Sequence, residues 1–142
     1  MPVFLVPVDG SDYSLRAVDY AARRMKSGTE PATLHLLNVQ PPIVTVNVKL
    51  FLSQESLETY YREEGTKALE PALAKAREHG VSATPHIGVG DPGKIICDYA
   101  TDKVADEIIM GTHGRGVLSG ALLGSVAQKV AHLTSIPLVL IK

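Results

Sequence analysis

The sequence predicts an α/β fold, a doubly wound sandwich built around one parallel β-sheet. Apolar, β-branched runs alternate along the chain with segments in which apolar residues recur at helical spacing. A strand, a helix and a second strand in succession form a parallel pair, because the helix carries the chain back to the same end of the sheet. Pro85 lies in the third apolar run, and because proline cannot donate a ladder hydrogen bond, that strand is expected at a sheet edge.

The chain is expected to begin with a strand, a helix and a second strand. Residues 3–8 are an apolar run typical of a strand that is buried on both faces. Residues 9–12 form a turn that can cap a helix, and apolar residues recur at helical spacing from Val18 to Met25. Residues 32–39 return to a strand pattern, which completes a right-handed parallel unit.

The middle of the chain is less regular. Residues 43–52 are apolar without a clear period, and no element is assigned to them. Ser53 starts a long helical pattern that ends at Gly80, and Pro71 in its interior is expected to kink or split the helix. Residues 81–89 form the third strand.

The last part of the chain is expected to hold two helices and two strands. Asp91 caps a helix over residues 92–103, a strand follows over 105–110, and residues 125–134 and 137–141 form the last helix and strand. The whole chain, 1–142, is therefore interpreted as a single domain with a five-stranded parallel sheet. An edge position for the third strand predicts the order 3-2-1-4-5, a Rossmann-like sheet.

Composition narrows the class of protein. A chain of 142 residues suits one domain, and 14 Lys and Arg against 15 Asp and Glu leave no basic field for nucleic acid or an anionic membrane. Cys97 is the only cysteine, so no disulfide forms within the chain. There is no basic leader before an apolar run, and no stretch reaches about 18 apolar residues. A cytoplasmic location is expected.

Two segments from opposite ends of the sequence are expected to meet. In the predicted order the chain direction reverses between strands 1 and 4, and ligands bind at the carboxyl ends of the strands beside such a reversal. Those ends are Asp9 and the loop that starts at Gly111. A carboxylate suits a hydroxyl or an amine, whereas loop N–H groups and the Ser125 hydroxyl suit phosphate, so a nucleotide is indicated. The alternative is that Asp9 and Ser125 simply cap the first and last helices.

The glycines of this loop have an informative spacing. Gly111 is followed after two residues by Gly114, and nine residues later by Gly124 and Ser125. Glycine allows positive φ and close backbone approach to a ligand. The helix start adds unpaired N–H donors and the positive end of its dipole. A strand, a glycine-rich loop and a helix in this order favour an anion site.

This spacing resembles the ATP-binding branch of the universal stress protein family. The resemblance extends over essentially the whole chain, through the opening Val-Pro-Val-Asp-Gly-Ser, the Leu-Leu-Asn-Val of the second strand, the Gly-Asp-Pro before the third helix and the final Pro-Leu-Val-Leu-Ile. It implies binding of ATP, with or without Mg²⁺, and a homodimer. One departure is Ala127, where some ATP-binding members have a threonine that adds a phosphate contact.

The resemblance also implies which residues bind. Adenine and ribose would be surrounded by Pro7, Val8 and Asp9 with backbone groups of Val39 and Met110. Ribose and phosphates would be held by Gly111, Gly114, Gly124, Ser125 and Val126. Arg115 and His113 lie in the same loop and could meet phosphate or face solvent. No catalytic residue and no metal site is indicated.

The expected function is therefore a regulatory, adenine-nucleotide-binding module in stress response that acts through protein partners not yet known or through its own dimer. The dimer is expected to form through the strand at residues 137–141, an apolar edge with unpaired backbone groups. Two alternatives stay open. One is an enzyme that slowly hydrolyses ATP or transfers adenylyl groups in the same pocket, and the other is a dimeric interaction protein without nucleotide.

Overall fold

The computed structural model describes residues 1–43, 53–114 and 122–142. Strands and helices alternate within these residues. In chain order they are β1 (Val3–Pro7), α1 (Asp12–Ser27), β2 (Thr33–Gln40), α3 (Gln54–Glu78), β3 (Thr84–Val89), α4 (Pro92–Asp102), β4 (Glu107–Gly111), α5 (Ser125–Leu133) and β5 (Leu138–Ile141). Residues 44–52 of the unassigned connection, and 115–121 of the glycine-rich loop, lie outside the described residues.

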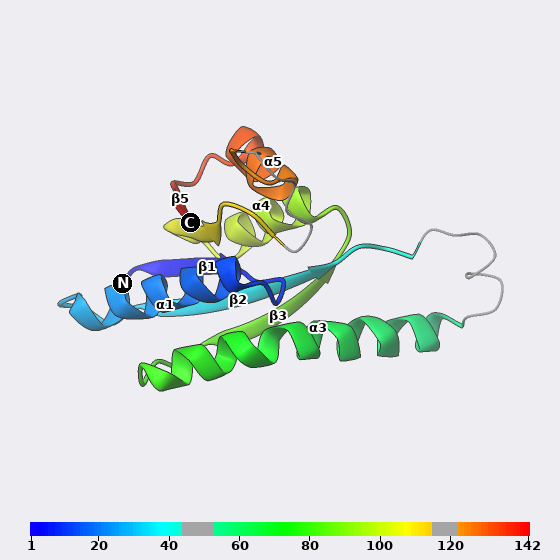
Figure 1. The fold of residues 1–142 in the computed structure, drawn as a ribbon, viewed down its shortest axis with the longest axis horizontal. Coiled ribbons are helices and arrows are strands. Elements are labelled where there is room, and N and C mark those ends of the chain that lie inside the picture. The colour runs from blue at the N-terminus through cyan, green and yellow to red at the C-terminus, as the bar shows by residue number, and fades with distance from the viewer. Residues whose placement is uncertain (44–52, 115–121) are drawn as a thin grey trace.

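The strands form one parallel sheet in the order β3-β2-β1-β4-β5, which confirms the predicted fold class (Figure 1). Pro85 lies in β3 and is paired in register with Leu36 of β2. Because β3 has a neighbouring strand on one side only among residues 1–43, 53–114 and 122–142, a residue without an N–H donor is accommodated there. The edge position inferred from this proline is confirmed.

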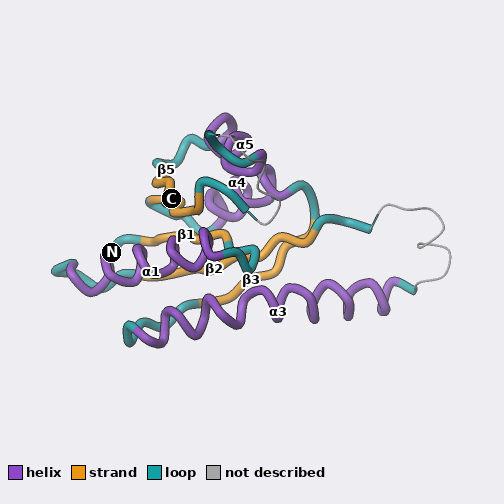
Figure 2. Tube along the Cα trace, in the orientation of Figure 1, coloured by secondary structure: helices purple, strands orange, loops and turns teal. Residues whose placement is uncertain are grey.

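Helices cover both faces of the sheet, α1 and α3 on one and α4 and α5 on the other (Figure 2). Each pair buries its own apolar cluster. Val18 and Leu36 belong to the cluster under α1 and α3, whereas Leu37 and Ile96 belong to the cluster under α4 and α5. Leu36 and Leu37 are neighbours in sequence but face opposite clusters, as the two-residue period of a strand requires. The sheet is therefore buried on both sides, and ligand access is left to its ends.

The long helix α3 runs from Gln54 to Glu78 across Pro71, so the expectation that this proline could split the helix is wrong. Pro71 is exposed, and its neighbours Leu69 and Ala72 are buried in the α1 and α3 cluster. Proline removes one backbone hydrogen bond from the helix. Burial of apolar side chains before and after it offsets that loss, because tertiary packing supplies most helix stability in proteins.

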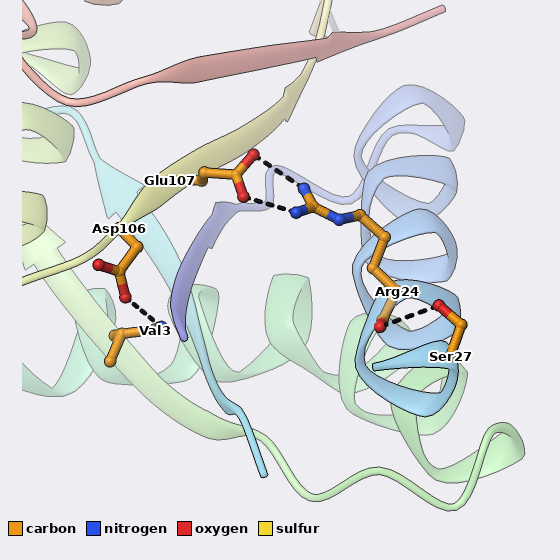
Figure 3. A network of polar contacts seen from close by, with 5 residues as sticks. All are labelled: Val3, Arg24, Ser27, Asp106 and Glu107. Atoms are coloured by element: carbon orange, nitrogen blue, oxygen red, sulfur yellow. Dashed lines mark hydrogen bonds and ion pairs between the residues drawn. The ribbon is translucent and has the colours of Figure 1, made fainter. Parts of the chain in front are cut away.

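An ion pair ties α1 to β4 at the amino ends of the central strands (Figure 3). The two terminal nitrogens of Arg24 donate to the two carboxylate oxygens of Glu107 at 2.8 and 2.7 Å. The guanidinium carbon also lies 4.9 Å from the centre of the Phe4 ring. Nearby, the N–H of Val3 donates to a carboxylate oxygen of Asp106 at 2.7 Å. These contacts hold the starts of β1 and β4 together.

Candidate functional site

The strands β1 and β4 separate before their carboxyl ends, and a cavity lies where they part. β1 stays in register with β2 as far as the pair of Pro7 and Leu37. With β4 it is in register only at Phe4 and Leu5. This is the point at which the strand order reverses, where open α/β sheets bind ligands. A cavity of about 280 Å³ has its lining at these strand ends.

The cavity brings together residues from both ends of the sequence. The predicted binding residues that the structure describes all line it, namely Pro7, Val8, Asp9, Val39, Met110, Gly111, Gly114, Gly124, Ser125 and Val126. Arg115, the remaining predicted residue, lies outside the described residues. The lining also contains four residues that sequence reasoning missed, Ser14, Leu37, Pro92 and Ile96. Ile96 could have been found, because its helical spacing already predicts an inward side chain.

Asp9 follows β1 in a tight turn that fixes its carboxylate. Gly10 has φ of +84°, a left-handed conformation that favours glycine. The N–H of Ser11 donates to Asp9 Oδ1 at 2.9 Å. The cap of α1 is Ser11 rather than Asp9, since the Ser11 hydroxyl oxygen accepts from the N–H of Ser14. The alternative that Asp9 serves as the helix cap is therefore wrong.

The glycines of the loop are required for space rather than for positive φ. Among the described glycines, only Gly10, Gly80 and Gly90 have positive φ, so that part of the expectation is wrong for Gly111, Gly114 and Gly124. A Cβ atom on Gly114 would lie 2.5 Å from Asp9 Oδ2. One on Gly111 would lie 2.7 Å from Tyr13 Cβ. The absence of side chains lets the loop approach the end of β1.

The start of α5 faces the cavity without a side-chain cap. Gly124 is the N-cap residue, and it makes no side-chain capping bond with a described residue. Its own N–H donates to the carbonyl of Thr112 at 2.7 Å, which holds the helix start against the end of β4. Ser125 is the first helical residue and does not cap the helix, so its hydroxyl is placed for another partner. Uncapped first-turn N–H groups and the helix dipole together favour an anion.

Apolar side chains form the rest of the lining. Leu37 and Val39 come from β2, Ile96 from α4 and Met110 from β4. They belong to the cluster under α4 and α5 or pack against it. The cavity therefore combines an apolar wall with a carboxylate and an uncapped helix start. This combination matches a ligand with a flat apolar part, hydroxyl groups and an anionic end.

His113 also lines the cavity, next to Gly114. Its ring centre lies 5.3 Å from that of Tyr13, and its Nδ1 lies 3.0 Å from the hydroxyl oxygen of Thr112. No group of three or more His, Cys, Asp or Glu side chains that could hold a metal ion occurs within residues 1–43, 53–114 and 122–142. None of the helices in these ranges is long and apolar enough to cross a membrane.

A doubly wound parallel sheet with a lined cavity at its reversal point defines the class of open α/β ligand-binding domains. Within this class, the chain belongs to the universal stress protein family, whose family model matches residues 1–142.

Individual relatives agree with the family match. Universal stress protein MJ0531 of Methanocaldococcus jannaschii is 34% identical over 139 residues, which cover 97% of this chain and 80% of that protein. The solved structure of MJ0577 from the same organism has a TM-score of 0.84 at 27% identity and covers 99% of this chain and 95% of the other. A universal stress protein solved in complex with cAMP has a TM-score of 0.69 at 25% identity, with 99% and 96% covered.

Proposed function

We propose that this chain is a regulatory module that binds an adenine nucleotide, ATP foremost, in the cavity between β1 and β4. The observation that carries the proposal is that the Asp9 carboxylate and the uncapped start of α5 line the same cavity, whose remaining walls are mainly apolar. A related protein of the same family is described in complex with cAMP, an adenine nucleotide. We also propose that residues 1–142 act as a single domain, in the cytoplasm.

Each part of the cavity suits one part of the ligand. The adenine would lie against Val39 and Met110, with Pro7 and Val8 at its border, and the Asp9 carboxylate would accept from ribose hydroxyls. The phosphates would accept from the N–H groups of Gly114 and Val126, from the Ser125 hydroxyl and, by the same proposal, from Arg115. Gly124, whose own N–H donates to the Thr112 carbonyl, would hold the start of α5 beside them. The proposal holds with or without a Mg²⁺ ion bound to the phosphates.

The binding free energy expected for this cavity is typical of a regulatory ligand. A hydrogen bond to a charged group contributes about 1.5–3 kcal/mol. A few amide donors together with Ser125 therefore account for micromolar affinity, about −8 kcal/mol, once the costs of association are subtracted. Ala127, which also lines the cavity, has no hydroxyl to add a further phosphate contact. Beside Ala127, phosphate binding therefore depends on backbone N–H groups and on the Ser125 hydroxyl.

Nucleotide content and turnover together test the proposal. Acid extraction of gently purified protein, followed by chromatography, is expected to release an adenine nucleotide, and calorimetric titration with ATP is expected to give a micromolar Kd. No bound nucleotide and no heat of binding would favour the dimeric interaction protein instead. Phosphate or pyrophosphate release by the pure protein, lost in an Asp9→Ala variant, would favour the enzyme that uses the same pocket.

The role of Asp9 has a separate test. Asp9→Ala is expected to weaken adenosine and ATP binding by similar factors, because the carboxylate is proposed to contact the nucleoside rather than the phosphates. Titration of the variant with both ligands measures this. Weaker binding of ATP alone would place Asp9 at the phosphates, acting through a metal ion.

A further inference from the structure

Asn38 is a buried polar side chain directly before the cavity residue Val39. It is 3% exposed and does not itself line the cavity. Its side-chain amide donates to the backbone carbonyl of Val8 at 2.8 Å, and its side-chain oxygen accepts from Gln40 Nε2 at 2.6 Å. Partners at both ends hold the buried amide in one orientation.

The strand register shows which backbone bond Asn38 replaces. The N–H of Val8 donates to the carbonyl of Leu37 at 2.8 Å, and the N–H of Gly90 donates to the carbonyl of Gln40 at 3.1 Å. Backbone groups alternate along a strand between its two neighbours, so Leu37 and Val39 face β1 whereas Gln40 faces β3. If the parallel ladder between β1 and β2 continued, its next bond would run from the N–H of Val39 to the carbonyl of Val8.

That bond is absent among the described residues, and the Val8 carbonyl accepts from the side chain of Asn38. The register of β1 with β2 ends at Pro7 and Leu37. The backbone of Val39 therefore faces the side of the sheet where β1 has ended and the cavity begins, and Val39 lines that cavity. A strand edge without its neighbour offers one N–H donor and one C=O acceptor side by side.

We propose that Asn38 is a positioning residue for base recognition, because its amide occupies the Val8 carbonyl and so leaves the N–H and C=O of Val39 unpaired for an adenine. This proposal rests on the proposed nucleotide binding. The N1 and N6 edge of adenine offers one acceptor and one donor, which match the N–H and C=O of a single residue. Guanine offers the reverse pattern at the same edge, which leaves both backbone groups without a partner. Asn38 thereby sets a preference for ATP over GTP.

The variant Asn38→Leu tests this role, because leucine is of similar size but cannot hold the Val8 carbonyl. The N–H of Val39 is then expected to bond to that carbonyl and extend the ladder. The affinity for ATP is expected to fall about 10-fold, and the preference over GTP by a similar factor, as the loss of one good hydrogen bond implies. Affinity for tripolyphosphate, which lacks a base, is expected to stay unchanged. A residue with only a structural role would not separate these ligands.

Arg24→Met is the matched control. It removes a partly buried polar contact at the opposite end of the sheet, so it is expected to lower stability without changing the preference for ATP over GTP. If a folded Asn38→Leu protein kept the ATP preference of the unmodified protein, the inference would be overturned while the proposed function stood. Failure of the unmodified protein to bind ATP or GTP would overturn the proposed function, and with it the base-recognition role.

Hydrogen exchange tests the ladder without any ligand or variant. In the unmodified, nucleotide-free protein the amide of Val39 is expected to exchange much faster than that of Leu37, which lies within the paired part of the strand. In Asn38→Leu the Val39 amide is expected to become protected. Equal protection of the two amides in the unmodified protein would overturn the inference, even if the leucine variant failed to fold.

Discussion

At Gly114 and Gly124 any side chain would meet atoms that shape the cavity. A Cβ on Gly114 would lie 2.5 Å from Oδ2 of the Asp9 carboxylate. A Cβ on Gly124 would lie 3.2 Å from His113 Cα and 3.3 Å from the Thr112 carbonyl oxygen, which are backbone atoms. The spacing of glycines in the sequence predicts where the loop approaches a ligand. The spacing alone does not place Asp9 beside the loop; the predicted strand order does, because it brings the ends of the first and fourth strands together.

Gly114→Val and Gly124→Val are each expected to abolish ATP binding, taken as a loss of at least about 100-fold, while the protein stays folded. Both side chains would occupy the approach to the phosphates without entering either apolar cluster. Calorimetric titration, with circular dichroism to check the fold, measures the effect. Gly28→Ala is a matched control, because its Cβ would meet nothing closer than 3.5 Å. Retained affinity in either folded valine variant would rule out the phosphate cradle.

Val104 has φ of +53° and is 77% exposed, an unusual conformation for a β-branched residue. The left-handed region costs an L-residue about 1–2 kcal/mol, and asparagine tolerates it better. Val104→Asn is therefore expected to stabilise the protein by about 1 kcal/mol and to raise Tm by about 3 °C. Thermal unfolding followed by circular dichroism measures the change. Val104→Ile keeps the branch and should give no gain; an equal gain in both variants would contradict the strain at this residue.

At the scale of elements, a carboxylate joins α1 to the end of α3. His79 Nε2 lies 2.6 Å from Asp19 Oδ1, and Arg23 Nε lies 3.0 Å from Asp19 Oδ2. The hydrogen bond with His79 is the largest cause that lowers the pKa of Asp19 below its ordinary 3.8; burial opposes it and the charge of Arg23 adds to it. Because the folded-state pKa is the lower one, the stabilisation is complete above 3.8 and is lost as the pH falls through the folded-state value.

Asp19→Asn is accordingly expected to reduce the free energy of unfolding near neutral pH and to have little effect in strong acid. Urea unfolding of both proteins between about pH 6 and about pH 2.5 measures the difference. The difference should shrink as the pH falls below 3.8. A difference that stays constant over this range would show that the carboxylate charge has no part in joining the two helices.

The sequence was most informative about elements where a local rule decides the structure. Pro85 indicated an edge strand because proline lacks a donor, and β3 is at the edge. The same rule was misleading at Pro71, where buried residues before and after the proline keep α3 continuous. Local propensity could not weigh that packing, since the partners of α3 lie in distant parts of the chain. The third strand also begins later than expected, at Thr84 rather than Val81, because Val81 instead bonds back to Ala76 at the end of α3.

For the whole molecule, the order of strands brings the two halves of the site together. Asp9 and Gly114 are far apart in sequence, and only the reversal of strand order between β1 and β4 makes them neighbours. Asp9 was predicted from its place at a strand end, and Gly114 from the spacing of the glycines in the loop after the fourth strand. Ser14 and Pro92 were missed because the packing of α1 and α4 against the sheet brings them to the cavity. The residues next to them in sequence do not indicate this packing.

We propose that β5 forms the interface of a homodimer. Within the described part of the chain it is an edge strand that pairs only with β4, and its four apolar residues are all half-buried. Antiparallel pairing with the same strand of a second copy would satisfy its outer N–H and C=O groups. Lys at Val139 and Ile141, which share one face, is expected to give a monomer or an unstable protein, since both side chains also pack against the α1 and α3 cluster. Leu133→Lys, at an exposed residue of α5, should leave the dimer unchanged.

Light scattering of the purified proteins at micromolar concentration measures this assembly. The unmodified protein and Leu133→Lys are expected at twice the mass of one chain. A monomer for the unmodified protein, or an unchanged dimer for the Val139→Lys and Ile141→Lys double variant, would exclude β5 as the interface.

The central claim, that an adenine nucleotide occupies the cavity between β1 and β4, is tested most directly by an amide chemical-shift titration of the unmodified protein with ATP. The amides of Asp9, Val39, Gly114 and Ser125 are expected to shift together and to saturate at one Kd, while the amide of Glu107 at the opposite end of the sheet stays unchanged. No shift at millimolar ATP, or saturable shifts confined to residues outside the cavity, would contradict the claim.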